Sequence, residues 1–364
     1  MNRQPLHLAA LAAASVPGLC PATVEPSPDD PAEFSTAIVV DTAGERWQIR
    51  SPHTPEAGIR LETELQVLAA FDPRLRAGLP FRVPSVAGAV RLNGLRTFVY
   101  QDLPGCPVPL ESLVALGEAA VQDLGRILAA VHALPVDVVE QADLPVYTPR
   151  QIRDRHLHEM DQAATTGRVP PVLLRRWEEA LEEDALWAFV PVPVHGDLHE
   201  DNLLVERGRV VGVSGWTDLH VGDPAADFAW LAAAEDPSFA DRVHRAYLDR
   251  RSADGTDDDG DPHLMRRASL LAEFALARWL LRGVDRQDQD MIADAVVMLS
   301  ELADAVREAE EEERAAVVAE AEAEAEAERT LTVVPEGEAS PGEAGSGQAP
   351  AEGTGRAARG STAL

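Results

Sequence analysis

One stretch of the sequence combines polar side chains that could do chemistry. Residues 194–202 read Val-His-Gly-Asp-Leu-His-Glu-Asp-Asn and precede the apolar run Leu203 to Val205, a pattern that predicts a strand end, a tight polar loop and a new strand. Asp197 brings a carboxylate, and Asn202 brings a carboxamide five residues later. A carboxylate can accept the proton of a hydroxyl group, and the oxygen of an amide suits a hard cation.

The D-x-x-x-x-N spacing of these two residues is typical of a kinase catalytic loop, in which Asp accepts the proton of the substrate and Asn holds a metal ion. A second loop with another metal-binding carboxylate should follow. The sequence has this loop as Val-Ser-Gly-Trp-Thr-Asp over residues 213–218. Gly215 stands where the carboxylate is expected, and Asp218 follows three residues later.

The elements that must position these loops fall into two halves. In the first half, alternating apolar residues predict strands over residues 35–41, 46–50, 83–90 and 96–100, and a helix over about 55–71. Gln-Asp-Leu-Pro-Gly over 101–105 breaks the pattern and suits a hinge. Beyond Leu110, long amphipathic helices are expected, one of them over 113–134.

The two loops together resemble the aminoglycoside and macrolide phosphotransferase family, whose fold is protein-kinase-like. The motifs that carry the resemblance are His195-Gly196-Asp197-Leu198-His199 with Asn202, and Gly222-Asp223-Pro224-Ala225-Ala226-Asp227. It covers roughly residues 1 to 300 and implies transfer of the γ-phosphate of ATP or GTP, with Mg²⁺, to a hydroxyl of an aminoglycoside- or macrolide-like small molecule. Antibiotic resistance is the implied biological role.

We therefore expect an α+β, bilobal protein-kinase-like fold. Residues 1–100 should form a nucleotide-binding lobe with an antiparallel sheet and one helix, 101–105 a hinge, and 106–306 a mainly helical catalytic and substrate lobe. A Glu/Ala-rich helical extension is expected over 307–334. It should be exposed to solvent or frayed, because it has almost no large apolar face. The Gly-, Ser- and Pro-rich segment 335–364 is predicted to be a disordered tail.

The resemblance implies a role for each site residue. Asp197 matches the catalytic base and Asn202 a magnesium ligand, with Asp218 as a second candidate ligand. The chain has no Lys, so the cation for the nucleotide phosphates is expected at Arg50, and Glu64 is its candidate ion-pair partner. A surface Arg and a solvated Glu are the ordinary alternatives.

Three more sets of polar residues surround this site. Gln101 to Leu103 should offer hinge backbone groups to the nucleotide base. His195 and His199 lack the H-E-x-x-H spacing of a zinc site and are expected to brace their loop through hydrogen bonds. Asp223 and Asp227 stand at a predicted helix start, where Asp is favoured as a cap, so a structural role is expected.

Gly215 leaves three interpretations open. In the first, the enzyme is an active small-molecule kinase that recruits Asp218 or Asp201 to the metal. In the second, it is a catalytically impaired pseudokinase or a nucleotide-binding regulatory module, because loss of a metal-bridging carboxylate removes a large part of the transition-state stabilisation. In the third, Asp197 does other chemistry on the same fold.

Composition restricts the partners. The net charge of −30 argues against non-specific binding of nucleic acid, which needs basic patches. The apolar, Ala-rich start of the chain fits an amphipathic helix better than a signal peptide, and no run reaches the length of a membrane span. Two widely separated cysteines make no motif, so we expect a cytoplasmic protein without a membrane partner. The acidic tail is a candidate site for a protein partner.

Overall fold

A computed structural model of the chain describes residues 5–27, 33–255 and 260–332, with side chains up to residue 323. The chain divides into one unit over Met1–Arg307 and a second over Glu308–Leu364. The tail predicted to be disordered, 335–364, lies outside the described residues. The described part of the chain holds no helix with the length and apolar character of a membrane span.

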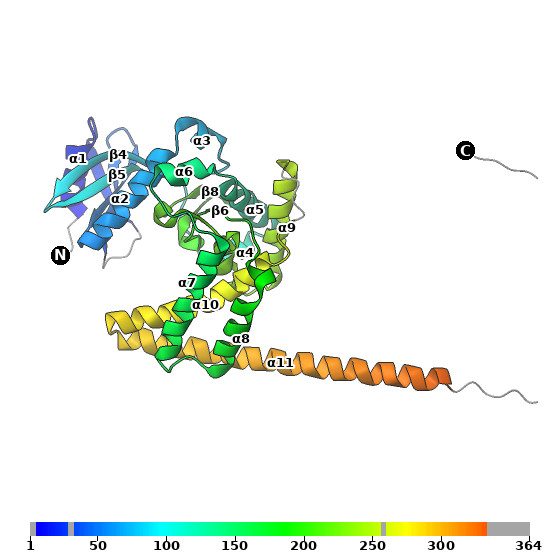
Figure 1. Ribbon diagram of the computed structural model, residues 1–364. Coiled ribbons are helices and arrows are strands. Elements are labelled where there is room, and N and C mark those ends of the chain that lie inside the picture. The colour runs from blue at the N-terminus through cyan, green and yellow to red at the C-terminus, as the bar shows by residue number, and fades with distance from the viewer. Residues whose placement is uncertain (1–4, 28–32, 256–259, 333–364) are drawn as a thin grey trace, which may run out of the picture. The chain divides into compact units, whose positions relative to one another are not determined.

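The N-terminal part of the first unit is built on a five-stranded antiparallel sheet in the order β1-β2-β3-β5-β4 (Figure 1). Its strands are β1 Pro21–Pro26, β2 Phe34–Asp41, β3 Arg46–Pro52, β4 Ser85–Leu92 and β5 Leu95–Gln101. The β4–β5 turn consists of Asn93 and Gly94, both with positive φ, as two-residue hairpin turns require. This turn sets the register of the strands that lead to the segment 101–105.

Helices cover both faces of the sheet, because the side chains of a strand alternate between its faces. Helix α1 (Pro5–Ser15) packs on one face and α2 (Pro55–Ala70) on the other. The α1 face buries Leu8, Ala12, Val39, Ile49 and Val99, and the α2 face buries Phe34, Leu61, Phe98 and Tyr100. Thr54 caps α2 by accepting a hydrogen bond from the N–H of Ala57. A short helix that was not predicted, α3 (Pro73–Gly78), follows.

Helices make up most of the C-terminal part of the first unit (Figure 1). They are α4 Leu110–Ala115, α5 Glu118–His132, α6 Val136–Gln141, α7 Pro149–Thr165, α8 Pro171–Glu182, α9 Ser238–Ala253, α10 Leu264–Arg286 and the first part of α11 Gln289–Thr332, which continues into the second unit. The described residues also include four 3₁₀ segments: η1 Asp184–Trp187, η2 Glu200–Asn202, η3 Trp216–Asp218 and η4 Pro224–Ala233. Strands β6 Val192–Val194 and β9 His220–Gly222 form one antiparallel pair, and β7 Leu203–Glu206 and β8 Arg209–Val213 form another. The predicted α+β class is confirmed.

The prediction of a single helix over 113–134 is wrong, because the chain forms two helices there. They are separated at Gly117, whose φ of 64° belongs to the left-handed region that glycine adopts without strain. Leu113 of α4 and Leu124 of α5 are both fully buried. The apolar repeat therefore continues across the break, and periodicity alone did not reveal it.

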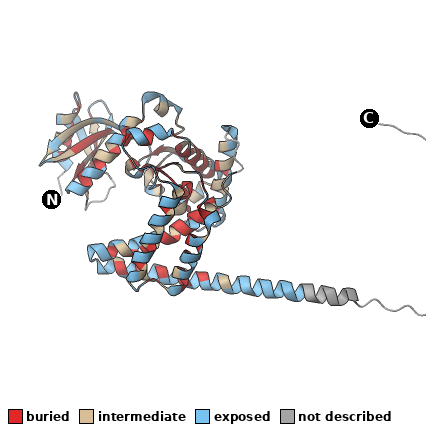
Figure 2. Ribbon diagram, in the orientation of Figure 1, coloured by how far each residue is buried: buried red, intermediate tan, exposed pale blue. Residues whose placement is uncertain are grey.

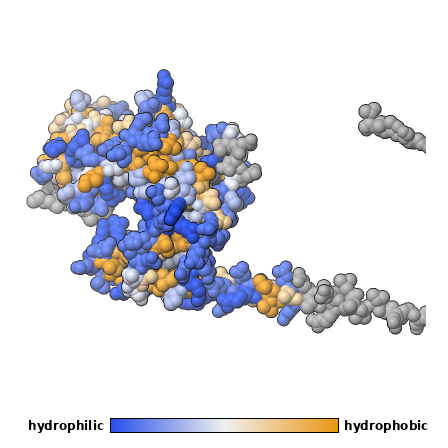
Figure 3. Space-filling model, viewed as in Figure 1, coloured by the Kyte–Doolittle hydropathy of each residue, from blue (hydrophilic) through white to orange (hydrophobic). Residues whose placement is uncertain are grey.

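Helix α11 changes character along its length. Up to Val306 it buries residues three or four positions apart, the spacing of one helical face: Ile292, Ala295, Leu299, Ala303 and Val306. From residue 311 to 323 every residue is exposed, as Figure 2 shows by colour. Figure 3 shows this part of α11 as hydrophilic except for one apolar patch, where Val317 and Val318 are exposed.

Candidate active site

The loop that carries Asp197 is anchored by a buried carboxylate. Asp227, in η4, accepts hydrogen bonds from the backbone N–H groups of His195 (2.8 Å) and Gly196 (2.9 Å), and lies 3.3 Å from Nε2 of His132. Burial raises the pKa of Asp227, but the hydrogen bond with His132, the charges of both histidines and the Gly196 N–H outweigh this effect, so the pKa is lowered. Asp227 thus remains a carboxylate that holds the start of the loop.

The structure separates the two aspartates that were expected to be caps. Asp223 does cap η4, since its carboxylate accepts a hydrogen bond from the N–H of Ala225 at 2.9 Å. It also accepts two hydrogen bonds from the guanidinium of Arg267, which is itself buried. Asp227 does not act as a cap but positions the catalytic-type loop, a role that only the fold reveals.

The two histidines of the loop brace it, as predicted. The ring of His195 is fully buried, its Nε2 lies 2.8 Å from the carbonyl oxygen of Ser214, and it packs edge-on against Trp216 with ring centroids 4.7 Å apart. His195 therefore ties the Asp197 loop to the loop that contains Gly215. Nδ1 of His199 accepts a hydrogen bond from the N–H of Asp201 at 3.3 Å.

Asp197 keeps its negative charge in this setting. Its side chain is about half exposed, and its Oδ2 lies 3.8 Å from Nε2 of His199. Burial raises the pKa of Asp197, but the interaction with His199 and the charges of His199, His195 and Arg60 together lower it. The same interaction raises the pKa of His199. An ionised carboxylate is the form that a general base requires.

The Asn202 side chain turns back onto the Asp197 loop and covers Gly215. Its Nδ2 donates a hydrogen bond of 2.7 Å to the carbonyl oxygen of Asp197, and the backbone carbonyl oxygen of Asn202 accepts one from the N–H of Ser214. Gly215 has φ 77° and ψ 38°, the left-handed region. A Cβ at position 215 would lie 2.3 Å from Oδ1 of Asn202, so the carboxamide fills the space in which a side chain would begin.

Asp218 approaches the same place from η3. Burial and the nearby negative charge of Asp197 raise its pKa, the direction expected for two carboxylates in one site. The backbone of the Asp197 loop packs closely against this segment, because a Cβ at Gly196 would lie 2.3 Å from the carbonyl oxygen of Asp218. Gly196, with φ 81°, allows both the turn and the close contact.

Arg50 and Glu64 form the ion pair that the sequence predicted. Nη1 of Arg50 on β3 lies 3.2 Å from Oε2 of Glu64 on α2, whose side chain is 3% exposed. The hydroxyl of Tyr100 donates a hydrogen bond to the same oxygen, and the Arg50 guanidinium lies 4.5 Å from the centre of the Phe34 ring. The pair is therefore fixed between strand and helix, with a guanidinium fork that can grip phosphate oxygens.

Gln101 and Leu103 form a third group, where the chain leaves the sheet. Between them, the backbone N–H of Asp102 donates to the carbonyl oxygen of Arg46, and the Asp102 carboxylate accepts a hydrogen bond from Nε of Arg46 at 2.7 Å. Gln101 and Leu103 both line cavities at this segment. The structure thus brings Asp197, Asn202 and Asp218 together, whereas the predicted nucleotide-binding residues lie in two other groups.

A cavity of about 620 Å³ opens beside Asp218. It is lined by Gly196 and Asp218 and by residues that sequence reasoning did not identify: Tyr147, which precedes α7, and, from α7 and α10, Ile152, Arg155, His156, Glu159, Leu271 and Arg278 among others. Burial raises the pKa of Glu159, but His156 and the charges of Arg278 and Arg155 lower it. In the sequence the polar residues of α7 resemble an ordinary solvated helix face; the His-x-x-Glu spacing at positions 156 and 159 was the only signal.

The oxygen atoms around Asp197 suit a hard cation that a bound phosphate ligand would also coordinate. Within the described residues, no three His, Cys, Asp or Glu side chains are grouped closely enough to hold a metal ion by themselves. Asn202 uses its Nδ2 in the contact with Asp197, which leaves the amide oxygen for a metal ion, and Asp218 adds a carboxylate. One or two protein oxygens plus phosphate oxygens and water is the usual coordination of Mg²⁺ in phosphoryl-transfer sites.

Comparison with known proteins supports the interpretation of the two loops. The sequence model of the phosphotransferase enzyme family matches residues 25–260, which is more than half of the chain. This stretch contains Arg50, Glu64, Asp197, Asn202 and Asp218.

Three known proteins are similar to large parts of the chain. It is 28% identical to the uncharacterized protein YcbJ of Bacillus subtilis over 54% of its own length and 65% of that protein, slightly under two thirds of the relative. It is 26% identical to viomycin phosphotransferase of Streptomyces vinaceus over 64% of its length and 78% of that enzyme. The crystal structure of the macrolide 2′-phosphotransferase MphH from Brachybacterium faecium has a TM-score of 0.66 at 24% identity, covering 81% of this chain and 97% of that one, and so shares its fold.

Proposed function

Because the chain belongs to the phosphotransferase enzyme family, we propose that it transfers the γ-phosphate of ATP or GTP to a hydroxyl group of a small molecule. One observation carries the proposal: Nδ2 of Asn202 donates a 2.7 Å hydrogen bond to the Asp197 carbonyl oxygen. This contact holds the two residues of the D-x-x-x-x-N pair in one site, as phosphoryl transfer requires.

In the proposed reaction Asp197 is the base. Its lowered pKa keeps the carboxylate ionised, and it takes the proton of the acceptor hydroxyl while the hydroxyl oxygen forms the new bond to phosphorus and ADP or GDP leaves. Arg50, oriented by Glu64, grips oxygens of the nucleotide phosphates. Asn202 and Asp218 would hold Mg²⁺, which supplies charge neutralisation on the phosphates.

The acceptor is proposed to occupy the cavity beside Asp218. Its volume of about 620 Å³ is in the range of sites for drug-sized molecules, and both apolar and charged side chains line it. One similar protein is named for viomycin, and proteins of similar fold are named for macrolides and aminoglycosides, so we propose a macrolide- or aminoglycoside-like acceptor. Glu159, which lies 3.5 Å from His156 and 3.6 Å from Arg278, could exchange these contacts for an ammonium or hydroxyl group of such a molecule.

Gly215 favours a second candidate function, a catalytically impaired protein that binds a nucleotide for regulation. The family pattern has a metal-binding carboxylate at this position, whereas here the Asn202 carboxamide fills the space. If Asp218 does not replace that carboxylate, the barrier to phosphoryl transfer rises by several kcal/mol. The rate then falls about a thousandfold or more.

Turnover and binding measurements together distinguish the two candidates. The full chain is incubated with ATP or GTP and a panel of macrolides and aminoglycosides, and phosphorylated product is detected by mass spectrometry. An acceptor-dependent product that requires Mg²⁺ supports the enzyme. No product with any acceptor, together with a nucleotide-induced rise in Tm that is equal with and without Mg²⁺, supports the regulatory module. No product and no rise in Tm with either nucleotide rejects both.

A further inference from the structure

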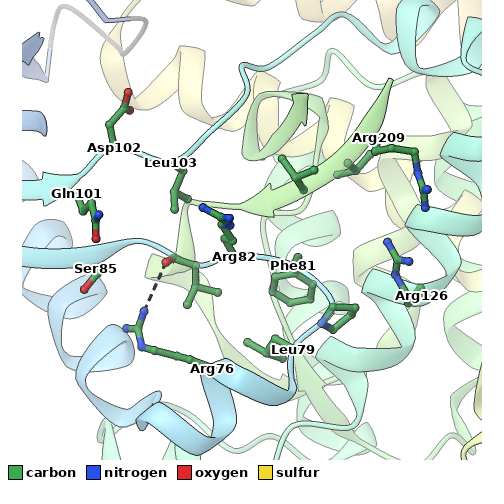
Figure 4. A pocket seen from close by; sticks show the side chains of 14 residues that line it. Arg76, Leu79, Phe81, Arg82, Ser85, Gln101, Asp102, Leu103, Arg126 and Arg209 are labelled. Carbon is green, nitrogen blue, oxygen red and sulfur yellow. Dashed lines mark hydrogen bonds between the residues drawn. The ribbon is translucent and has the colours of Figure 1, made fainter. Parts of the chain in front are cut away.

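A second cavity, of about 690 Å³, lies where the α2–β4 connection, the end of β5 and strand β8 meet. We call it the arginine cavity, because Arg76, Arg82, Arg126 and Arg209 line it (Figure 4). Its lining residues, all of them described, include a single carboxylate, that of Asp102. None of the residues placed above at the catalytic base, the metal or the acceptor site lines it, whereas Gln101 and Leu103, expected beside the nucleotide base, do.

Arg76 brings a positive charge that no carboxylate offsets. Its guanidinium donates hydrogen bonds to the carbonyl oxygens of Leu68 (2.6 Å), Phe71 (2.7 Å) and Pro84 (2.9 Å), and no ion pair to it occurs in the described part of the chain. Partial burial lowers the pKa of Arg76, although the group remains charged. A partly desolvated cation held by carbonyl dipoles alone is a favourable neighbour for an anion.

Arg126 and Arg209 share one buried carboxylate. Nη2 of Arg126 lies 2.7 Å from Asp123 Oδ1, and Nε of Arg209 lies 2.8 Å from Oδ2. Asp123 is fully buried, and although burial raises its pKa, Arg209, the Val210 N–H and Arg126 lower it. The two guanidinium groups and the one carboxylate together carry a net charge of +1. The Nε of Arg126 is buried without a hydrogen-bond partner among the described residues.

Arg82 is the fourth cation, and its side chain makes no hydrogen bond or ion pair with any described residue. Its backbone is fixed to β8, since its N–H donates to the Val211 carbonyl oxygen and its carbonyl oxygen accepts from the Val213 N–H, both at 2.9 Å. Figure 4 shows its side chain between Leu103 and Phe81. Arg82 thus presents a free guanidinium from a rigid position.

We propose that the arginine cavity binds a small organic phosphate at a site separate from the one around Asp197. The four guanidinium groups outnumber the two carboxylates nearby, Asp123, which Arg126 and Arg209 share, and Asp102, which already accepts a hydrogen bond from Arg46. This local excess of positive charge stands out in a chain of net charge −30. Guanidinium forks match phosphate oxygens, and the volume suits a ligand larger than inorganic phosphate.

The position of the cavity indicates what the ligand would influence. It would touch Leu103 in the segment that joins the sheet to the helical part, and also Val210 and Val211 of β8, the strand that leads to Gly215. A bound phosphate would hold these segments together and so communicate with the site around Asp197.

Calorimetric titration of the full chain with pyrophosphate, at constant ionic strength, tests the proposal. Arg82→Gln removes a side chain without protein contacts and is expected to weaken binding severalfold. The double variant Arg82→Gln/Arg126→Gln is expected to weaken it at least about tenfold, because each removes a charge-assisted hydrogen bond. Arg91→Gln, an exposed arginine of β4 outside the cavity, is the matched control and should change the affinity less than about twofold.

The pyrophosphate affinity of the Arg50→Gln variant distinguishes binding in the arginine cavity from binding at the proposed nucleotide site. Unchanged pyrophosphate affinity in Arg50→Gln, with the loss in the Arg82 variants, supports the arginine cavity even if no turnover is ever found. Wild-type affinity in both Arg82→Gln and the double variant overturns the proposal, as does the absence of any binding heat up to millimolar pyrophosphate. Arg82→Gln decides the question alone if the double variant unfolds.

Discussion

The Asn202 carboxamide occupies the space into which a side chain at position 215 would extend. Its Oδ1 lies 2.3 Å from the place of a Cβ on Gly215, while its Nδ2 holds the carbonyl oxygen of Asp197. The missing carboxylate and the conformation of Asn202 are therefore one structural feature. Any residue larger than glycine at 215 must displace the carboxamide and break its contact with the Asp197 loop.

Gly215→Asp is expected to destabilise the metal-free protein by about 1–3 kcal/mol. The left-handed conformation disfavours a Cβ, the Asn202–Asp197 hydrogen bond is lost, and a third carboxylate joins Asp197 and Asp218. Mg²⁺ should then raise the Tm of the variant more than that of wild type. Gly215→Ala adds the Cβ without the charge, so equal Mg²⁺ effects in the Ala and Asp variants would contradict the assignment of this loop to a metal.

Asp197→Asn is expected to lower turnover by about 10²–10⁴-fold, the usual contribution of a general base. The change is isosteric, so a nucleotide-induced rise in Tm should persist. Steady-state rates with the best acceptor and thermal unfolding with ATP measure the two effects. Asp249→Asn, an exposed carboxylate of α9, serves as the control. Wild-type turnover in Asp197→Asn would remove the base from the mechanism.

The acid limb of the pH–rate profile should depend on His199. The base works only when it is ionised, and the pKa of Asp197 is lowered. The value of kcat/KM should therefore stay constant down to a pH below about 3.9, the ordinary pKa of Asp, and should fall once the pH drops below the lowered pKa of Asp197. His199→Ala removes the interaction that lowers this pKa, which shifts the limb to higher pH. His158→Ala, an exposed histidine on α7, should leave the limb in place. An unshifted limb in His199→Ala would show that another group is the base.

Arg50→Gln is expected to raise the KM for the nucleotide about tenfold or more, because a charge-assisted contact to phosphate is lost. Glu64→Gln keeps the shape but loses the charge that orients Arg50, so a smaller rise is expected. Initial rates at varied nucleotide concentration measure both, with Arg91→Gln as the charge control. A KM for nucleotide unchanged from wild type in Arg50→Gln would place the phosphates elsewhere.

Asp227→Asn should lower the free energy of unfolding by about 1–3 kcal/mol at pH 7, because the His195 and Gly196 N–H groups bond to different carboxylate oxygens, and Asn replaces one of these acceptors with an NH₂ donor. The folded pKa of Asp227 is lowered, so its contribution is fully present above the unfolded value of about 3.9 and is lost as pH falls through the lower folded value. Urea unfolding of the wild type and of Asp227→Asn between pH 7 and pH 3 measures the difference between their free energies of unfolding. This difference should become smaller only at the acid end of the range. A pH-independent difference would contradict the carboxylate as the anchor.

Local patterns were enough to predict much of the fold. Alternation identified β2 and β3, and the 3.6-residue repeat identified α2, because each pattern reflects which side chains one element buries. The same repeat missed the break at Gly117, since α4 and α5 bury their apolar residues in the same core. The short helix α3 has too few residues for a repeat to be visible.

The amino-acid order by itself determined the candidate chemistry: a carboxylate and a carboxamide at fixed spacing in one loop, with glycine where a second carboxylate was expected. Tertiary structure alone decided what surrounds them. Asp227 anchors the loop from more than 30 residues away, Asn202 covers Gly215, and four arginines from separate elements meet in one cavity. Spacing along a chain constrains neighbours within one element, whereas contacts between distant elements depend on packing, which no local pattern encodes.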